Sequence, residues 1–139
     1  MVIKEKGQSL VEFGISLVFL MLLLGGLAEF GIVFFQYVQL SDAAQEGALY
    51  GSLHPYDTVS IEERVRYASS QTPLNLTSPE VEIFVSYPDG SLCEGNGVKV
   101  SVTYHHKIFM PFLPQLLGSD DILLNGEVVD TILDQSCNT

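Results

Sequence analysis

The longest apolar run of the chain lies near its N-terminus and constrains the fold more than any other feature. Residues 13–35 read FGISLVFLMLLLGGLAEFGIVFF, and Glu29 is the only charged residue among them. As an α-helix this run would extend about 35 Å, which is enough to cross the hydrocarbon core of a bilayer. Its Leu, Ile, Val and Phe side chains favour insertion by more than the cost of about 3 kcal/mol for one acidic residue near the helix centre. We therefore expect a transmembrane helix over about 13–35.

The basic residues around this run predict its orientation. Lys4 and Lys6 precede it, and the next basic residue is Arg64. The positive-inside rule then places the N-terminus in the cytoplasm and the rest of the chain outside the cytoplasmic membrane. An alternative is a removable secretory signal with a small-residue cleavage site at residues 26–28. The 17 acidic residues against 6 basic ones, with a net charge of −11, argue against a nucleic-acid partner.

The helical pattern continues beyond the apolar run. One face would carry apolar residues and another polar ones, namely Val33, Tyr37, Leu40, Ala44 and Ala48 on the first and Gln39, Asp42 and Glu46 on the second. Gly51 has the position of a C-cap. The sequence therefore predicts one long helix over about residues 9–50, with a membrane end and a domain end.

Small residues form a stripe on this helix. Gly14, Gly25, Ala28 and Ala43 fall within about 60° of one another at 100° per residue, which would allow a second helix to approach closely. Glu29 has no His, Cys or second acid beside it in the apolar run, so a packing or partner role is favoured over catalysis. We interpret Gly14, Gly25, Ala28 and Glu29 as residues for intramembrane packing or partner contact. The alternative for the glycines is that Gly is simply frequent in membrane helices.

The remainder of the chain has the pattern of a small α+β domain. A short helix is expected over about 59–71, with Ser60 and Glu63 as a capping box. Strands are expected at 80–87, at 98–106 and at about 122–133, the last interrupted by a bulge or turn at Asn125 and Gly126. Packed on the amphipathic half of the long helix, about three antiparallel strands would give a pilin-like α+β fold.

An apolar stretch with two prolines, KIFMPFLPQLLGSDD, separates the last two expected strands. Its side chains are unusually apolar for a loop. They would form a lid over the sheet, or a patch that touches the membrane or a partner.

We find no motif that predicts catalysis or a cofactor. His105 and His106 are adjacent, and adjacent side chains on a strand point to opposite faces, so they would not share a metal ion. Asp89, Glu94 and Asn96 offer oxygen ligands but lack the spacing of a calcium loop, and a solvated turn is favoured. The chain is therefore not expected to be an enzyme.

The two cysteines, Cys93 and Cys137, both lie in the part expected outside the cytoplasm. Two cysteines are too few for a four-ligand zinc site and suit one disulfide in an oxidising compartment. The alternative is two unrelated thiols.

The residues before the apolar run, KEKGQSLVEF, resemble the cleavage signal of type IV pilin precursors. The resemblance rests on Gly7, four intervening residues, then Glu12 and Phe13 at the start of the apolar helix. It implies that a prepilin peptidase removes residues 1–7 as a leader and leaves Gln8 as the new N-terminus. It also implies that Glu12 pairs with the new amine of an adjoining subunit during assembly. The alternative for Glu12 is a solvated residue at headgroup level.

A wider resemblance covers about residues 7–51. GQSLVEFGISLVFLMLLLGGLAEFG followed by LSDAAQEGALYG is similar to the N-terminal signature of the TadE-like family of tight-adherence pilus proteins. The resemblance implies a membrane-anchored minor pilin or pseudopilin, with other pilin subunits and an inner-membrane assembly platform as partners. Val18 departs from the family, where a proline is frequent, as do Gln45 and Leu49, where arginines are frequent.

The expected organisation is therefore a leader at 1–7, a long helix at 8–51 and an exported domain at 52–139. Two other functions fit parts of this pattern. One is a pseudopilin of a type II secretion system, which shares the leader. The other is a membrane-tethered or secreted binding domain that does not polymerise.

Overall fold

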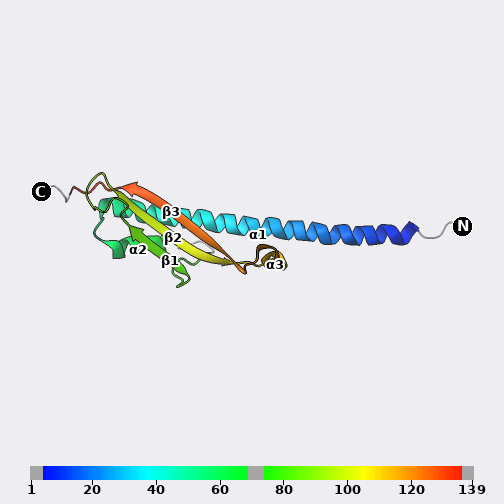
Figure 1. The fold of residues 1–139 in the computed structure, drawn as a ribbon. Helices are drawn as coiled ribbons and strands as arrows, with labels where there is room; N and C mark the ends of the chain where they lie inside the picture. Colours follow the sequence, from blue (N-terminus) through cyan, green and yellow to red (C-terminus); the bar gives the residue numbers. More distant parts are fainter. Residues whose placement is uncertain (1–4, 69–73, 136–139) are drawn as a thin grey trace.

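The computed structural model describes residues 5–68 and 74–135, and its architecture is a long helix with a small three-stranded sheet along one half (Figure 1). The elements follow in the order α1 (Glu5–Leu53), α2 (Thr58–Tyr67), β1 (Val81–Ser86), β2 (Gly97–Lys107), α3 (Leu113–Leu117) and β3 (Asp121–Thr131). The predicted α+β fold, a long N-terminal helix packed on a small antiparallel sheet, is confirmed.

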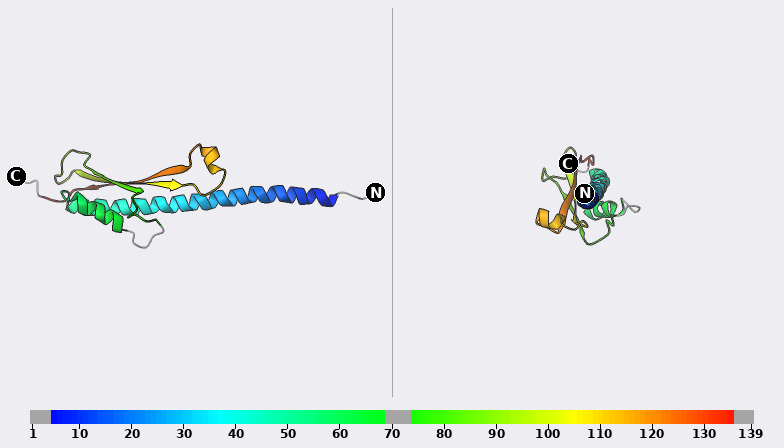
Figure 2. Two further views of the ribbon diagram at one scale, coloured as in Figure 1. Left: turned by 90° about the horizontal axis from the view of Figure 1, so that it is seen from below. Right: turned by 90° about the vertical axis from the view of Figure 1, so that its right-hand side faces the viewer.

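Helix α1 has two halves with different surroundings. Its N-terminal half extends free of the domain, and its C-terminal half lies along the sheet (Figures 1 and 2). Large apolar side chains are exposed all round the free half, as the composition of the apolar run requires. Gly51, predicted as a C-cap, lies inside the last turn instead. A Cβ there would meet Ile61 at 3.0 Å and Val98 at 3.1 Å, so close packing accounts for this glycine.

The sheet has the order β1-β2-β3, and both pairs are antiparallel. β2 also runs antiparallel to α1, because Val98 lies near Gly51 at one end and His106 bonds to Glu29 at the other. The predicted interruption of the last strand at Asn125 and Gly126 is wrong, because both residues pair with β2 in continuous register.

Gly126 has a different role from the predicted bulge. A Cβ at this position would lie 2.6 Å from the carbonyl carbon of Leu40 and 2.6 Å from the amide nitrogen of Ser41, both in the backbone of α1. The glycine therefore allows the helix to lie directly on the strand.

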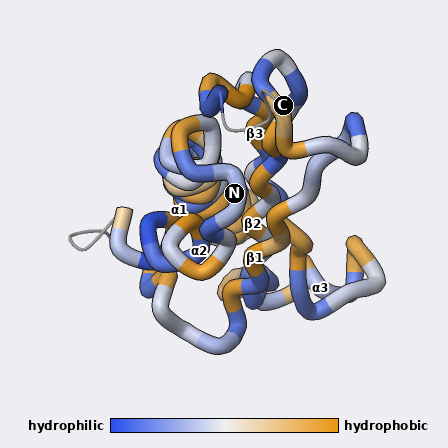
Figure 3. The backbone as a smooth tube through the Cα atoms, turned by 90° about the vertical axis from the view of Figure 1, so that its left-hand side faces the viewer, coloured by the Kyte–Doolittle hydropathy of each residue, from blue (hydrophilic) through white to orange (hydrophobic). Residues whose placement is uncertain are grey.

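The core forms where the inward side of the sheet meets α1, and α2 closes it on another side. Figure 3, which looks along α1, shows α2 and the three strands grouped beside the long helix. Buried side chains come from all three layers and include Leu40, Ala44, Ala48, Ile61, Val65, Val100 and Val102. Gln39 is buried and Tyr37 is exposed, the reverse of their predicted places. The sheet and α2 together cover a wider arc of α1 than a single apolar stripe, and this arc includes Gln39.

Helix α2 begins at Thr58, one residue before the predicted start, and is capped differently from the prediction. Its N-cap is Asp57, whose Oδ1 accepts a hydrogen bond from the Ser60 amide at 3.1 Å. The predicted capping box of Ser60 and Glu63 is therefore wrong. The predicted end of this helix, near Gln71, lies outside the described residues. Hydrogen bonds from Ser60 hold the pKa of the Asp57 carboxyl below its usual value.

Candidate functional site

The free end of α1 presents the residues that the pilin resemblance singles out. Gln8, Glu12 and Phe13 are exposed, and a Cβ at Gly7 would meet nothing within 4 Å. The Gln8 side chain donates a hydrogen bond from Nε2 to Glu12 Oε1 at 3.3 Å, one helical turn away. None of the ion pairs between described side chains includes Glu12. The carboxylate is therefore accessible to a cation from another molecule.

The second carboxylate of the apolar run, Glu29, is buried, with 4 % of its surface exposed. Its Oε1 accepts hydrogen bonds from His106 Nε2 at 2.8 Å and from the Phe109 amide at 3.0 Å. Its Oε2 accepts one from the Met110 amide at 3.0 Å. All three donors belong to the sheet domain of the same chain. Glu29 thus joins the helix to the end of β2 and to the loop that follows.

The loop between β2 and β3 reaches back along α1 toward its free half. Both views of the fold place α3, within this loop, at the end of the sheet nearest the N-terminus (Figures 1 and 2). Met110 lies over Gly25, where a Cβ would be 3.3 Å from the methionine Cε. Between loop and helix lies a hollow of about 320 Å³, lined mostly by apolar side chains that include Met21, Leu22, Ala28, Ile32, Phe109 and Pro111. Gly25 therefore accommodates a loop of its own chain.

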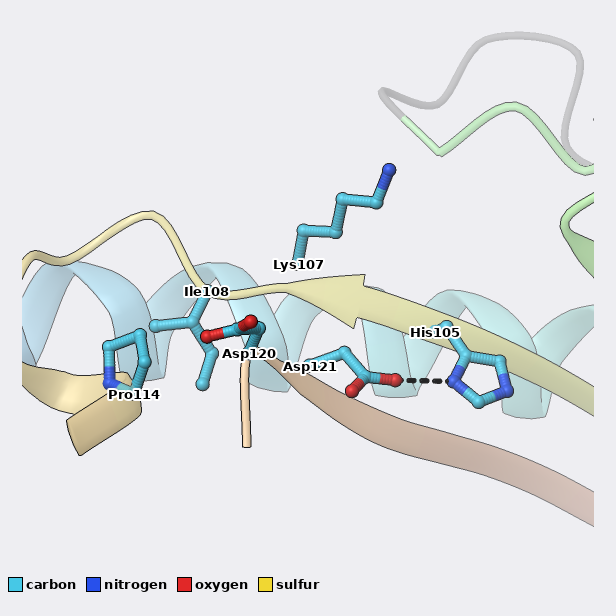
Figure 4. Close-up of a pocket in the computed structure, with 6 residues that line it drawn as sticks. All are labelled: His105, Lys107, Ile108, Pro114, Asp120 and Asp121. Carbon is cyan, nitrogen blue, oxygen red and sulfur yellow. Dashed lines mark hydrogen bonds and ion pairs between the residues drawn. The ribbon is translucent and has the colours of Figure 1, made fainter. Parts of the chain in front are cut away.

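The two adjacent histidines have opposite surroundings, as alternation along a strand predicts. His106 faces α1 and is buried, whereas His105 is exposed and its Nδ1 lies 2.6 Å from Asp121 Oδ2. Figure 4 shows this exposed pair beside a shallow hollow that is also lined by Lys107, Ile108, Pro114 and Asp120. The hydrogen bond from His105 is the main cause that lowers the pKa of the Asp121 carboxyl. Within residues 5–68 and 74–135, no three His, Cys, Asp or Glu side chains are placed to hold a metal ion.

The structure brings some of the predicted site residues together and leaves others apart. Gly25, Ala28 and Glu29 meet at the β2–β3 loop. Gly14 lies on the free half of α1 with open space around it, whereas Ala43 is buried against the domain. The small-residue stripe is therefore divided between a free part and a covered part.

The structure describes only one of the two cysteines of the predicted disulfide. Cys93 lies in the loop between β1 and β2 and is not a free thiol. Cys137 lies outside the described residues. The pairing of Cys93 with Cys137 therefore stays a prediction.

The sequence did not predict His106 as the partner of Glu29. His106 lies outside the apolar run, 77 residues further along the chain than Glu29. A signal was present on both sides of the contact. His106 follows Val98, Val100, Val102 and Tyr104 in strict alternation, so it belongs to the inward face of β2. Glu29 precedes the buried Leu40 by 11 residues, which is about three helical turns and therefore the same face.

Comparisons with known proteins give a match for the long helix α1, which also has the length and composition of a membrane-spanning helix. No curated protein and no solved structure matches the chain significantly. Among the described residues, one helix, over Gly7–Leu53, is long and apolar enough to cross a membrane, which suggests a membrane anchor. Residues 7–49 match the model of a protein family described as TadE-like protein. This match confirms the resemblance predicted from the sequence: by its N-terminal helix the chain is similar to the TadE-like proteins, a family that suggests a role in tight-adherence pilus assembly.

Proposed function

We propose that this chain is a minor pilin or pseudopilin of a tight-adherence pilus, cleaved by a prepilin peptidase and assembled through α1. The observation that carries the proposal is the TadE-like match, which begins at Gly7 and covers most of α1. The accessibility of residues 7–13 at the free end of the helix supports it, because a peptidase needs to reach the bond after Gly7.

In this proposal, cleavage creates the cation that Glu12 lacks. Hydrolysis of the bond between Gly7 and Gln8 leaves an ammonium group at Gln8, four residues from Glu12. An acidic side chain at the edge of the hydrocarbon is costly unless it is paired. The amine of a neighbouring subunit can supply that pairing and set the axial position of one helix against the next. Proteolysis and assembly are then coupled through one ion pair.

The membrane arrangement follows from the same helix. Before assembly, the apolar run anchors the subunit in the cytoplasmic membrane, with the N-terminus inside and the sheet domain outside. Lys4 and Lys6 before the run, together with the absence of Lys and Arg from residues 7–63, support this orientation. In the filament, the exposed apolar side chains of the free half of α1 pack against helices of other subunits instead of lipid.

Sequencing the N-terminus of the protein recovered from cells tests the first step. We expect the mature chain to begin at Gln8, and a Gly7→Val variant to retain the leader. A start at Glu29 would indicate ordinary secretion, and an intact Met1 in a working protein would indicate a tethered domain; either result contradicts the proposal.

A Glu12→Ala variant tests the second step. We expect it to be cleaved and inserted in the membrane but absent from sheared pili. Glu46→Ala is the matched control, because Glu46 is an exposed acid on the other half of the same helix and should not affect assembly. Incorporation of Glu12→Ala at the level of Glu46→Ala would contradict the pairing mechanism.

A further inference from the structure

Residues 108–118 of the loop between β2 and β3 expose more large apolar side chains than any other stretch of this length in the described part of the sheet domain. Phe109, Phe112, Leu116 and Leu117 are all exposed. No charged residue occurs within this loop, while Lys107 precedes it and Asp120 and Asp121 follow it. An uncharged apolar loop bounded by charges is typical of a segment that meets a membrane surface.

The position of the loop along α1 identifies the membrane as its neighbour. Met110 lies against Gly25, and the amides of Phe109 and Met110 bond to Glu29. Both α1 residues belong to the apolar run 13–35 that we expect to span the bilayer. Glu29 lies about 26 Å along the helix from Glu12, which the proposed function places at the inner edge of the hydrocarbon, and this distance is close to the thickness of the hydrocarbon core. The loop is therefore held at the outer boundary of the bilayer whenever the helix spans it.

Part of the loop backbone, above all its first three residues, is suited to a place without water. An amide that faces lipid needs a partner within the protein. Hydrogen bonds from five loop amides have acceptors in the chain: Ile108 donates to Asp120, Phe109 and Met110 to Glu29, Leu116 to Phe112, and Gly118 to Pro114. Pro111 and Pro114 have no amide hydrogen. Glu29 thus supplies the acceptors that this part of the loop requires beside an apolar helix.

We propose that this loop is a second membrane contact, which inserts Phe109, Phe112 and Leu116 among the lipids at the outer face of the bilayer beside α1. The occupant of this apolar surface is lipid, because the surface is continuous with the membrane-spanning half of α1. Lys107, Asp120 and Asp121 remain in water and limit the depth of insertion. The inference rests on the membrane anchoring in the proposed function. The inserted loop would fix the depth and the tilt of the unassembled subunit relative to the bilayer.

The chain contains no tryptophan, so single tryptophans can report on the loop without background. Three phenylalanines of nearly equal exposure serve as matched sites: Phe112 in the loop at 69 %, Phe19 in the apolar run at 69 %, and Phe84 in β1 at 67 %. Phe84 pairs in register with Ser101, about 23 Å of strand away from the loop. Each full-length variant is placed in phosphatidylcholine vesicles whose acyl chains carry bromine, a short-range quencher of tryptophan emission.

We expect Phe112→Trp to lose emission to the brominated lipid and to emit at shorter wavelength, as Phe19→Trp does, while Phe84→Trp is unaffected. Leu116→Trp provides a second probe of the loop in case Phe112→Trp does not fold. Quenching of Phe19→Trp without quenching of either loop probe would overturn the inference and leave the anchor intact. Loss of quenching at Phe19→Trp as well would overturn both. Loop emission that follows the protein-to-lipid ratio instead of the bromine would mean that a second copy covers the loop, and this also overturns the inference.

Discussion

Replacement of His106 by alanine tests whether Glu29 fastens the sheet domain to the long helix. The change removes the imidazole that bonds to Glu29 Oε1 at 2.8 Å and leaves the carboxylate buried with only the amides of Phe109 and Met110. Loss of one hydrogen bond to a buried carboxylate costs about 1.5–3 kcal/mol. For a domain of this size each kcal/mol shifts the melting temperature by about 4–8 °C. We therefore expect His106→Ala to melt at least about 6 °C below the wild type.

The neighbouring histidine provides the matched control. His105 lies on the same strand and also contacts a carboxylate, but this pair is exposed to water. Exposed pairs contribute little to stability, so His105→Ala should melt close to the wild type. Thermal unfolding of the full-length chain in detergent micelles measures both variants, and hydrogen exchange of the peptide over residues 108–118 reports on the loop. Equal melting temperatures for the two variants would refute the reasoning.

A change at Glu29 separates the charge from the hydrogen bonds. Glu29→Gln keeps one side-chain oxygen as an acceptor, whereas Glu29→Ala leaves the imidazole and two amides without their partner. Each buried donor left unpaired costs about 1–3 kcal/mol. We expect faster exchange of the Phe109 and Met110 amides in Glu29→Ala than in Glu29→Gln. The same exchange in both variants would show that the loop is held by apolar packing instead.

Three further outcomes follow from the structure. Gly126→Ala should lower the free energy of unfolding by about 1–3 kcal/mol in thermal melts, because its Cβ would collide with the backbone of α1 at Leu40. In an NMR titration the Asp121 carboxyl should titrate below the usual aspartate range, and His105→Gln should raise its pKa, because the imidazole hydrogen bond is the main cause of the lowering. Since its folded-state pKa is lowered, Asp121 contributes stability above the unfolded-state pKa, and this contribution is lost as the pH falls through the folded-state value. Asp57→Ala should increase hydrogen exchange in the first turn of α2, which loses its cap.

Each of these outcomes has its own control. Gly14→Ala adds the same methyl group where nothing lies within 4 Å, so it should leave the melting of the sheet domain unchanged. An unshifted Asp121 titration in His105→Gln would show that the hydrogen bond does not determine the pKa. Asp57→Asn keeps an acceptor for the Ser60 amide and should protect the first turn of α2; fraying as large as in Asp57→Ala would contradict the capping role.

The architecture could be predicted from the sequence because it depends on two simple patterns, a long apolar run and an alternation of apolar and polar residues. The apolar run is long enough to define the helix alone, and the alternation over Val98, Val100 and Val102 defines the inward face of β2. The predictions were wrong where the identity of a residue is determined by a contact with a residue that is distant in the sequence. Gly126 was interpreted as a break in its strand, yet it is there because of the backbone at Leu40. Local propensity contains no information about such a close approach.

The candidate site divides in the same way. The residues at the free end, Gly7 and Glu12, could be selected from the sequence because they match the motif of the pilin resemblance, which is a short local pattern before the apolar run. For Glu29 the sequence contains only the periodicity that places Glu29 and His106 on inward faces, because the other two donors are backbone amides, which any residue type supplies. The helical position of Glu29 relative to Leu40 would have indicated the direction of the contact but not its partner.

The attachment of the sheet domain at both ends of its contact with α1 has a mechanical consequence. At one end the Leu133 amide donates to the Ser52 carbonyl, and at the other the loop amides donate to Glu29. A pulling force along the helix is therefore shared by two separated sets of hydrogen bonds, which are loaded together in shear. Strand β2 connects the two sets. Two separated attachments oppose rotation of the domain about either one, so a force applied to the helix is transmitted to the sheet.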